Sequence, residues 1–311
     1  MSNRPRHDYK AHFRAIQMST RIMFAYCEGR SCDPYVYSEL VRRAQPAGEK
    51  TYELYRIEEI TGTGGKAALI QTFGVMRKKR LLTSNFKGKS FACVFFLDKD
   101  VDDLKRRRLR SDHIFYTALY DLEAHILRDC DLVRALAIGL NTDIEEISPS
   151  YRNAASWVEA KATQWEHWLR LCVFSALFDL DCGCGYGRPS QVHSASTGET
   201  DITAYTRFKA RLATKSGLSE SEFNREFARI EKTIARMKKR NSLSLIFKGK
   251  WLNSILSNEV HRQFSGKPIN FDGLSTRTFG AAMACFSFDT GWARAHVGRL
   301  SRIISDLSPV R

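Results

Sequence analysis

Residues 20–28 read TRIMFAYCE and residues 90–98 read SFACVFFLD. Each stretch is a nearly continuous apolar run, which is typical of a strand that is buried on both faces of a parallel sheet. The first run ends at a carboxylate, Glu28, and the second ends at another, Asp98. The two runs therefore predict two interior strands of one sheet, with an acidic side chain at the end of each.

The residues around these runs alternate between helical and strand patterns. We expect, in chain order, a helix at 34–44, a strand at 51–60, a helix at 65–82, a short helix at 101–111, a strand at 112–118 and a helix at 121–139. Strands that alternate with helices predict a mostly parallel sheet that is flanked by helices. The predicted fold class is therefore α/β, and we expect residues 1–145 to form this domain.

Strand patterns become rare after residue 145. Residues 153–180 predict one long helix, and residues 218–241 predict the clearest helix of the chain, because Ser219 and Glu222 form a capping box. The apolar residues of that helix step by four, three, four and three along one face: Phe223, Phe227, Ile230, Ile234 and Met237. We therefore expect residues 146–311 to form a mostly helical domain for dimerisation or for binding a partner or substrate.

The chain is strongly basic. Its 311 residues include 49 Lys and Arg but only 34 Asp and Glu, which gives a net charge of +15. An excess of this size attracts polyanions, of which nucleic acid is the commonest. The alternatives are an acidic protein partner and a basic face that only meets solvent. We expect contact with nucleic acid.

No stretch indicates a membrane or a secretory signal. No apolar run reaches the roughly 18 residues of a membrane span, and the basic start MSNRPRHDYK is not followed by the apolar segment of a signal peptide. We therefore expect a cytoplasmic protein with reduced cysteines. Cys182 and Cys184 are separated by one residue and no second pair is present, so the spacing does not favour a structural zinc site.

The two predicted strand ends bring acidic residues together. Functional groups of open α/β sheets gather at the carboxyl ends of the strands. If the two strands are neighbours, Glu28, Asp98 and Asp100 converge, and a divalent cation such as Mg²⁺ or Mn²⁺ would relieve their repulsion. Such an ion polarises phosphate and activates water. The alternatives are that Glu28 only caps a turn and that the two aspartates only cap the following helix.

The same residues resemble the signature of the TOPRIM fold, in which Glu-Gly follows one strand and Asp-x-Asp follows a later one. Here these motifs are Glu28-Gly29 and Asp98-Lys99-Asp100. The stretches EGRSCDPYVY (28–37) and IFYTALYDLEAHIL (114–127) narrow the resemblance to a group related to the OLD nucleases. That group includes the nuclease subunit of PARIS-type anti-phage defence. The likeness covers roughly residues 20–140, with a weaker one in IFKGKWLNSIL (246–256).

The resemblance implies a Mg²⁺-dependent endonuclease that cleaves RNA, such as tRNA, or DNA. Glu28, Asp98 and Asp100 would then be the catalytic metal ligands, with Glu28 also a candidate general base. It further implies a toxic defence effector that is controlled by an ABC-type ATPase sensor subunit and is active as a homodimer. The alternative is a TOPRIM scaffold without catalysis that binds nucleic acid or protein. A primase-like polymerase is less favoured, since no zinc module is evident.

Two further acids are candidates beside this set. Asp33 suits the N-cap of a helix whose first residue is Pro34, and a role at a second metal is the alternative. Glu123 lies within the region of resemblance, in the first turn of a predicted helix, and is a further candidate ligand. His125, two residues later, is expected to be structural.

Several basic residues are candidates for phosphate contact. TGTGGKAAL (61–69) lacks the pattern of an ATP-binding phosphate loop, but Lys66 at a helix start can still meet a phosphate. The run that contains Lys105, Arg106 and Arg107 closely follows the acids and suits a clamp on a nucleic-acid backbone. Lys248 and Lys250 of FKGKW are weaker candidates. For each of them, the alternative is a solvated surface position.

Overall fold

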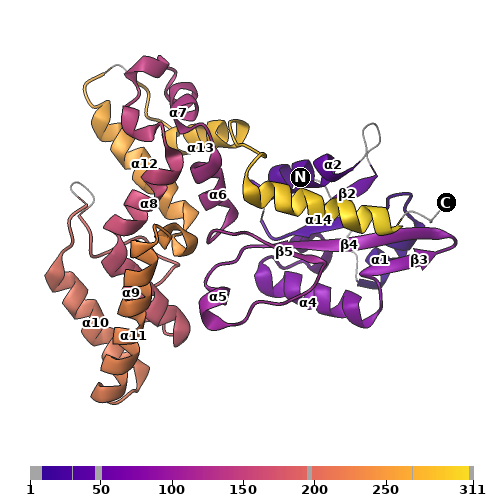
Figure 1. Cartoon of the computed structure of the whole chain (residues 1–311), viewed down its shortest axis with the longest axis horizontal. Helices are drawn as coiled ribbons and strands as arrows, with labels where there is room; N and C mark the ends of the chain where they lie inside the picture. The colour runs from indigo at the N-terminus through magenta and orange to yellow at the C-terminus, as the bar shows by residue number, and fades with distance from the viewer. Residues whose placement is uncertain (1–8, 30, 46–50, 195–197, 268, 308–311) are drawn as a thin grey trace. The chain divides into compact units, whose positions relative to one another are not determined.

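The structure is a computed structural model that describes residues 9–29, 31–45, 51–194, 198–267 and 269–307 (Figure 1). The chain forms two compact units. The first contains Met1–Asp98, Leu109–Thr117 and Phe288–Arg311, and the second contains Lys99–Arg108 and Ala118–Ser287. The predicted boundary between residues 145 and 146 falls inside the second unit, and the chain crosses between the units several times.

The described residues of the first unit form a five-stranded sheet. Its strands are β1 (Met23–Cys27), β2 (Tyr52–Arg56), β3 (Thr83–Phe86), β4 (Lys89–Leu97) and β5 (Ile114–Tyr116). The order is β2-β1-β4-β3, and β5 pairs with the carboxyl end of β4. Only β3 is antiparallel to its neighbour. The predicted α/β class with a mostly parallel sheet is confirmed.

The two apolar runs are the two central strands. Every residue of β1 is buried, and so are the last seven residues of β4. On one face, α1 (Tyr9–Met18), α3 (Ile57–Thr61) and α4 (Lys66–Lys78) share a core with alternate residues of both strands. On the other face, Tyr37 of α2 (Asp33–Ala44) stacks on Phe96 of β4, with ring centroids 4.3 Å apart. Burial on both faces explains why these runs are apolar without alternation.

The last helix of the chain belongs to the first unit. Helix α14 (Gly291–Leu307) packs against α2 and β4. The Trp292 indole N–H donates to the carbonyl oxygen of Tyr116 at 3.2 Å, and the Ser301 hydroxyl donates to that of Ala44 at 3.0 Å. These residues thus lie outside the second unit, although the sequence pattern predicts them as part of the helical domain of residues 146–311.

Two predicted elements of the first unit differ from the structure in their ends. The strand expected at 51–60 ends at Arg56, because Ile57 and Ile60 are buried at helical spacing in α3. The helix expected at 65–82 ends at Lys78, and a hairpin of β3 and β4 follows. Its two turn residues, Lys87 and Gly88, both have positive φ, as a type I′ turn requires.

The described elements of the second unit are helical. They are α5 (Asp102–Lys105), α6 (Leu122–Asp129), α7 (Leu132–Leu140), α8 (Ala154–Gln164), α9 (Glu166–Leu177), α10 (Ile202–Ser216), α11 (Glu220–Lys239), α12 (Gly249–Gln263) and α13 (Leu274–Ala284), with short 3₁₀ turns at Ile144–Glu146, Pro149–Tyr151 and Leu243–Ile246. The helix expected at 121–139 is broken after Asp129, where Asp131 caps α7. The helix expected at 153–180 is broken at Trp165. The short helix expected at 101–111 keeps only one turn.

Helix α11 has the predicted capping box between Ser219 and Glu222. Phe223 and Phe227 of its apolar stripe pack on Phe174 of α9, with ring centroids 5.0 and 5.7 Å apart. The apolar stripe thus packs inside the same chain and gives no reason to expect a dimer. The homodimer stays a prediction. In the part of the chain that the structure describes, no helix combines the length and apolar character that a membrane span requires.

Candidate functional site

Glu28 and Asp98 leave the sheet at the same edge. Strands β1 and β4 are parallel neighbours with Tyr26 opposite Phe95, and the two acids directly follow these strands. Burial raises the pKa of Tyr37 in α2, and the nearby carboxylates of Asp33 and Asp98 raise it further. Glu28, Asp33 and Asp98 of the predicted site therefore all belong to this edge of the first unit.

Asp33 does not cap α2 in the predicted way. The helix begins at Asp33 itself, and Cys32 at the N-cap position makes no capping hydrogen bond with its side chain. The Asp33 carboxylate instead accepts a hydrogen bond of 2.7 Å from the backbone N–H of Gly29. Burial raises the pKa of Asp33, and this hydrogen bond opposes the rise. Asp33 thus fixes the loop that leaves β1 and presents Glu28.

Gly29 is required by the close approach of that carboxylate. A Cβ atom at position 29 would lie 2.9 Å from the Asp33 carboxyl carbon and 2.9 Å from each of its oxygens. Real Cβ atoms essentially never come so close to another heavy atom. A glycine directly after a strand often permits a sharp turn. The structure instead assigns it to a tight contact between the loop and α2.

Lys66 lies at the same edge of the sheet. It is the first residue of α4, as predicted, and its ammonium donates a hydrogen bond to the backbone carbonyl oxygen of Asp98. The ammonium also lies 5.8 Å from the centre of the Tyr116 ring. A positive charge is therefore held where β4 ends. This position suits contact with an anionic group of a ligand.

The other residues of the Asp-x-Asp motif have their contacts in the second unit. The Asp100 N–H donates to the carbonyl oxygen of Tyr120 at 2.7 Å, and Asp100 has a φ of 51°, a backbone conformation that aspartate tolerates better than most residues. The Lys99 ammonium is buried and donates to the carbonyl oxygen of Ala118 at 2.6 Å. Burial lowers the pKa of Lys99 to about 8. The backbone that follows Asp98 is thus held by specific contacts.

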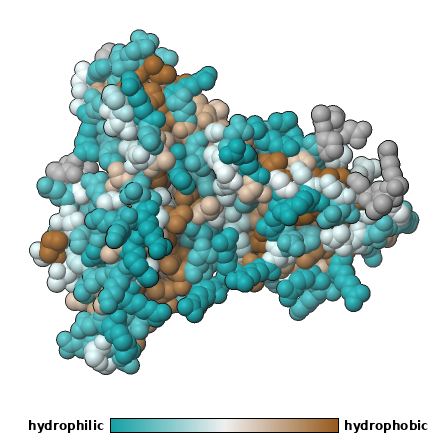
Figure 2. All heavy atoms as spheres, viewed as in Figure 1, coloured by the Kyte–Doolittle hydropathy of each residue, from teal (hydrophilic) through white to brown (hydrophobic). Residues whose placement is uncertain are grey.

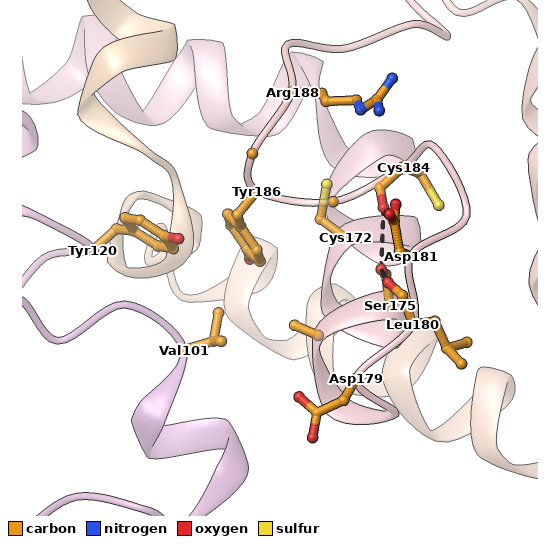
Figure 3. Close-up of a pocket in the computed structure, with 13 residues that line it drawn as sticks. Val101, Tyr120, Cys172, Ser175, Asp179, Leu180, Asp181, Cys184, Tyr186 and Arg188 are labelled. Carbon is orange, nitrogen blue, oxygen red and sulfur yellow. Dashed lines mark hydrogen bonds between the residues drawn. The ribbon is translucent and has the colours of Figure 1, made fainter. Parts of the chain in front are cut away.

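A pocket of about 450 Å³ lies in the second unit (Figure 3). Figure 3 shows Tyr120 and Tyr186 on one side of it, with Cys172, Ser175 and Cys184 on the other. The two tyrosine rings stack with centroids 4.7 Å apart. Burial raises the pKa of both tyrosines, and the Asp100 carboxylate raises each of them further, so Asp100 lies near this pair. No pattern in the sequence predicts this pocket, part of whose lining comes from the loop that follows α9.

The cysteines of that loop are thiols in the structure. The sulfur atoms of Cys182 and Cys184 lie 3.3 Å apart. The Ser175 hydroxyl lies within hydrogen-bonding distance of the carbonyl oxygens of both Leu180 and Cys184, at 2.7 and 3.0 Å. The loop is therefore held to α9 by side-chain contacts.

The predicted phosphate-contact residues of the second unit mostly have partners inside it. Lys105 and Arg107 form ion pairs with Asp179 at 2.6 and 3.3 Å. Arg106 ends α5 with a φ of 54°. The Lys248 ammonium donates to the carbonyl oxygen of Tyr186 at 2.8 Å, whereas Lys250 is exposed. Lys105, Arg107 and Lys248 thus have structural contacts that sequence reasoning did not anticipate.

Asp121 is a structural centre that sequence reasoning missed. Its carboxylate is 3% exposed and accepts hydrogen bonds from the N–H of Ala124 in α6, at 2.9 Å, and from that of Gly249 in α12, at 3.0 Å. A Cβ atom at position 249 would lie 2.2 Å from the nitrogen of Ala124. Burial raises the pKa of Asp121, and the Glu123 carboxylate adds to the rise. Glu123 therefore lies close to Asp121 in the second unit.

His125 is structural, as expected. Its Nε2 accepts hydrogen bonds from the backbone N–H groups of Ala118 and Leu119, at 3.0 and 3.1 Å. Its Nδ1 lies 3.1 Å from a carboxylate oxygen of Asp129. Two accepted bonds at Nε2 place the ring proton on Nδ1, so the ring is neutral, and burial lowers its pKa accordingly.

Within the described residues, no three His, Cys, Asp or Glu side chains gather closely enough to form a metal-ligand group. Mg²⁺ commonly uses one or two carboxylates together with substrate phosphates and waters, so a site of that kind needs no such group. Glu28 and Asp98 supply the right donor type at one edge of the sheet. No family model matches this chain, and no curated protein is significantly similar to it.

Proposed function

We propose that this chain is a Mg²⁺-dependent nuclease of the TOPRIM type that hydrolyses phosphodiester bonds of RNA or DNA. One observation carries the proposal: Glu28 and Asp98 end neighbouring parallel strands at one edge of the sheet. The ammonium of Lys66 is held at the same edge by the carbonyl oxygen of Asp98. Two acids and a cation at the carboxyl ends of central strands suit the binding of a metal and a phosphate.

The residues at this edge fit the chemistry of a hard divalent cation. Carboxylate oxygens are the ligands that Mg²⁺ prefers, and one or two of them suffice. When bound, the ion would neutralise phosphate charge and lower the pKa of a bound water. Glu28 and Asp98 hold it in this proposal. Asp100, two residues further along the chain, stays a predicted ligand, as do Asp33 and Glu123.

The remaining residues at this edge would position the reacting groups. The hydrogen bond between Gly29 and Asp33 fixes the loop that presents Glu28. Glu28 would then be placed to accept a proton from the attacking water. Lys66, at the N-terminus of a helix, would bind a non-bridging phosphate oxygen, because both its charge and the helix end favour anions.

The test is an isosteric loss of charge. Glu28→Gln should abolish cleavage of tRNA, plasmid DNA and single-stranded oligonucleotides in Mg²⁺, and it should weaken Mn²⁺ binding measured by calorimetry. The control is Glu145→Gln, since Glu145 is also a glutamate but is exposed on a surface turn. Unchanged cleavage by Glu28→Gln, or full activity of the wild type in excess EDTA, contradicts the proposal. Sequencing the ends of the products identifies the substrate.

We extend the proposal to a toxic effector of anti-phage defence that is restrained by a partner ATPase. It rests on the resemblance in the two acidic motifs and on the need to control a nuclease inside its host. Expression with an ATPase encoded beside it should be tolerated until a phage trigger arrives, and the two proteins should purify together. If wild type and Glu28→Gln affect growth and phage resistance equally, the effector role fails and a scaffold without catalysis gains support.

A further inference from the structure

Helix α11 carries a row of basic side chains opposite its buried stripe. These residues are Arg225, Arg229, Lys232, Arg236 and Lys239, and all of them are exposed. Each follows a member of the apolar stripe by two residues, which is a rotation of about 200° on a helix. They step by four, three, four and three, so they share one face over about 21 Å. We call these five residues the cationic stripe.

The cationic stripe lies in a strongly basic part of the chain. Residues 202–240, which cover α10 and α11, contain eleven Lys and Arg but four Asp and Glu. Their net charge of +7 is nearly half of the +15 of the whole chain, in about an eighth of its length. In Figure 2 the region of α10 and α11 is mainly hydrophilic on the face in view. A large share of the positive excess therefore lies in this part of the chain.

Little of the positive charge of the cationic stripe is neutralised within the protein. Glu226 lies 3.5 Å from Arg225 and 3.7 Å from Arg229, and both arginines are about 70% exposed. Two other acids of α11 have separate tasks, since Glu222 forms the capping box and Glu231 pairs with Arg170. Among the described residues, the remaining three members of the cationic stripe form no ion pair. A helix gains at most about 1 kcal/mol from each cation near its C-terminus, which does not require so long a row.

We propose that the cationic stripe binds the phosphate backbone of a nucleic-acid duplex. A duplex carries one negative charge per about 1.7 Å of its axis and is straight over the length of the stripe. A straight row of cations on a rigid helix matches such a partner, because neither side needs to be ordered on binding. This inference rests on the proposed nuclease function and names a surface of the second unit that binds the substrate.

The expected size of the effect follows from counterion release. Each phosphate that is neutralised contributes about 0.9 to the slope of log K against log salt for a duplex, and about 0.7 for a single strand. Removing the three unpaired cations should therefore lower the slope by about 2.7. At about 150 mM salt this corresponds to a loss of affinity on the order of 100-fold.

The experiment compares two triple variants of equal charge. Lys232→Gln/Arg236→Gln/Lys239→Gln removes three cations of the stripe, and Arg77→Gln/Lys78→Gln/Lys79→Gln removes three exposed cations at the end of α4. Binding of fluorescent 20-base-pair DNA and RNA duplexes and of a 20-nucleotide single strand is followed by anisotropy from about 50 to 300 mM salt. EDTA is present, so cleavage does not enter the measurement.

The stripe variant should lose about 2.7 in slope on a duplex, whereas the α4 variant should lose less than 1. The DNA and RNA arms show which duplex is preferred. Equal losses in both variants, or no loss in the stripe variant, overturn the assignment of the surface. A larger loss on the single strand than on either duplex overturns the assignment of the partner. If the stripe variant behaves as expected but the wild type cleaves no nucleic acid in Mg²⁺, the nuclease proposal fails and the binding surface stands.

Discussion

Replacing Gly29 with alanine should destabilise the first unit. The new Cβ would lie 2.9 Å from all three atoms of the Asp33 carboxyl group, against about 3.5–4.0 Å for a comfortable contact. Forcing an extra methyl group into a packed site costs about 1–3 kcal/mol. If the carboxylate retreats, the 2.7 Å hydrogen bond from the Gly29 N–H is lost as well, which costs about 1–3 kcal/mol more. We expect a total loss of about 2–4 kcal/mol in the free energy of unfolding.

The matched control is Gly74→Ala in α4. A Cβ there meets nothing within 4 Å, and alanine is favoured over glycine inside a helix by about 0.5–1 kcal/mol. The same chemical change should thus stabilise at position 74 and destabilise at position 29. Hydrogen exchange of peptides from β1 and β4, measured over a urea series, reports the stability of the first unit in each variant.

A double variant tests the cause. In Gly29→Ala/Asp33→Ala, the carboxyl group that the new methyl would strike is gone. The combined loss should therefore be smaller than the sum of the single losses by at least about 1 kcal/mol. If Gly29→Ala is as stable as the wild type, or if the two changes add without coupling, the contact between Gly29 and Asp33 does not explain the glycine.

Two further predictions follow from the buried aspartates. Gly249→Ala should destabilise the second unit by about 2–4 kcal/mol, because its Cβ would meet the backbone of Ala124 at 2.2 Å. Gly280→Ala, with open space around the Cβ, should be neutral or stabilising. Hydrogen exchange of peptides from α6 and α12 over a urea series reports both changes. Asp33→Asn should flatten the pH dependence of the free energy of unfolding. Burial raises the pKa of Asp33 above its ordinary value of 3.8. The contribution of Asp33 to stability is therefore complete below pH 3.8 and is lost as the pH rises through the raised pKa. Asparagine keeps an acceptor for the Gly29 N–H but cannot ionise. Equal pH slopes for wild type and variant between about pH 4 and 7 would contradict this reasoning.

The central strands and their terminal acids were accessible from sequence because the signal is local. A strand buried on both faces reads as an apolar run, and β1 and β4 are such runs. The parallel pairing of β1 and β4 turns Glu28 and Asp98 into neighbours at one edge. The sequence alone does not predict this pairing, because neither apolar run carries a signal that identifies its neighbouring strand.

The features that sequence reasoning missed depend on contacts or backbone conformations without a local signal. The hairpin of β3 and β4 turns through Lys87-Gly88 instead of the typical Asn-Gly, so the sequence pattern predicts no element over residues 83–89. The return of α14 to the sheet joins residues that are more than 170 positions apart. The breaks at Asp131 and Trp165 are hidden inside continuous amphipathic patterns. In each case tertiary packing, not propensity, decides the outcome.

Gly29 and Gly249 belong to the two motifs of the resemblance that contain a glycine, and one physical rule explains both. Each donates its N–H to a buried aspartate carboxylate, Asp33 for the first and Asp121 for the second. Neither has the positive φ for which glycine is usually required, and at each a Cβ would strike neighbouring atoms at 2.9 Å or less. The glycines therefore serve close approach rather than a turn. The close contact of Gly29 with Asp33 fixes the loop that presents Glu28. The close contact of Gly249 with Asp121 joins the N-termini of α6 and α12. A substitution at either position should disturb its aspartate first, so structural damage at position 29 should reach the candidate site, while damage at position 249 should remain in the second unit.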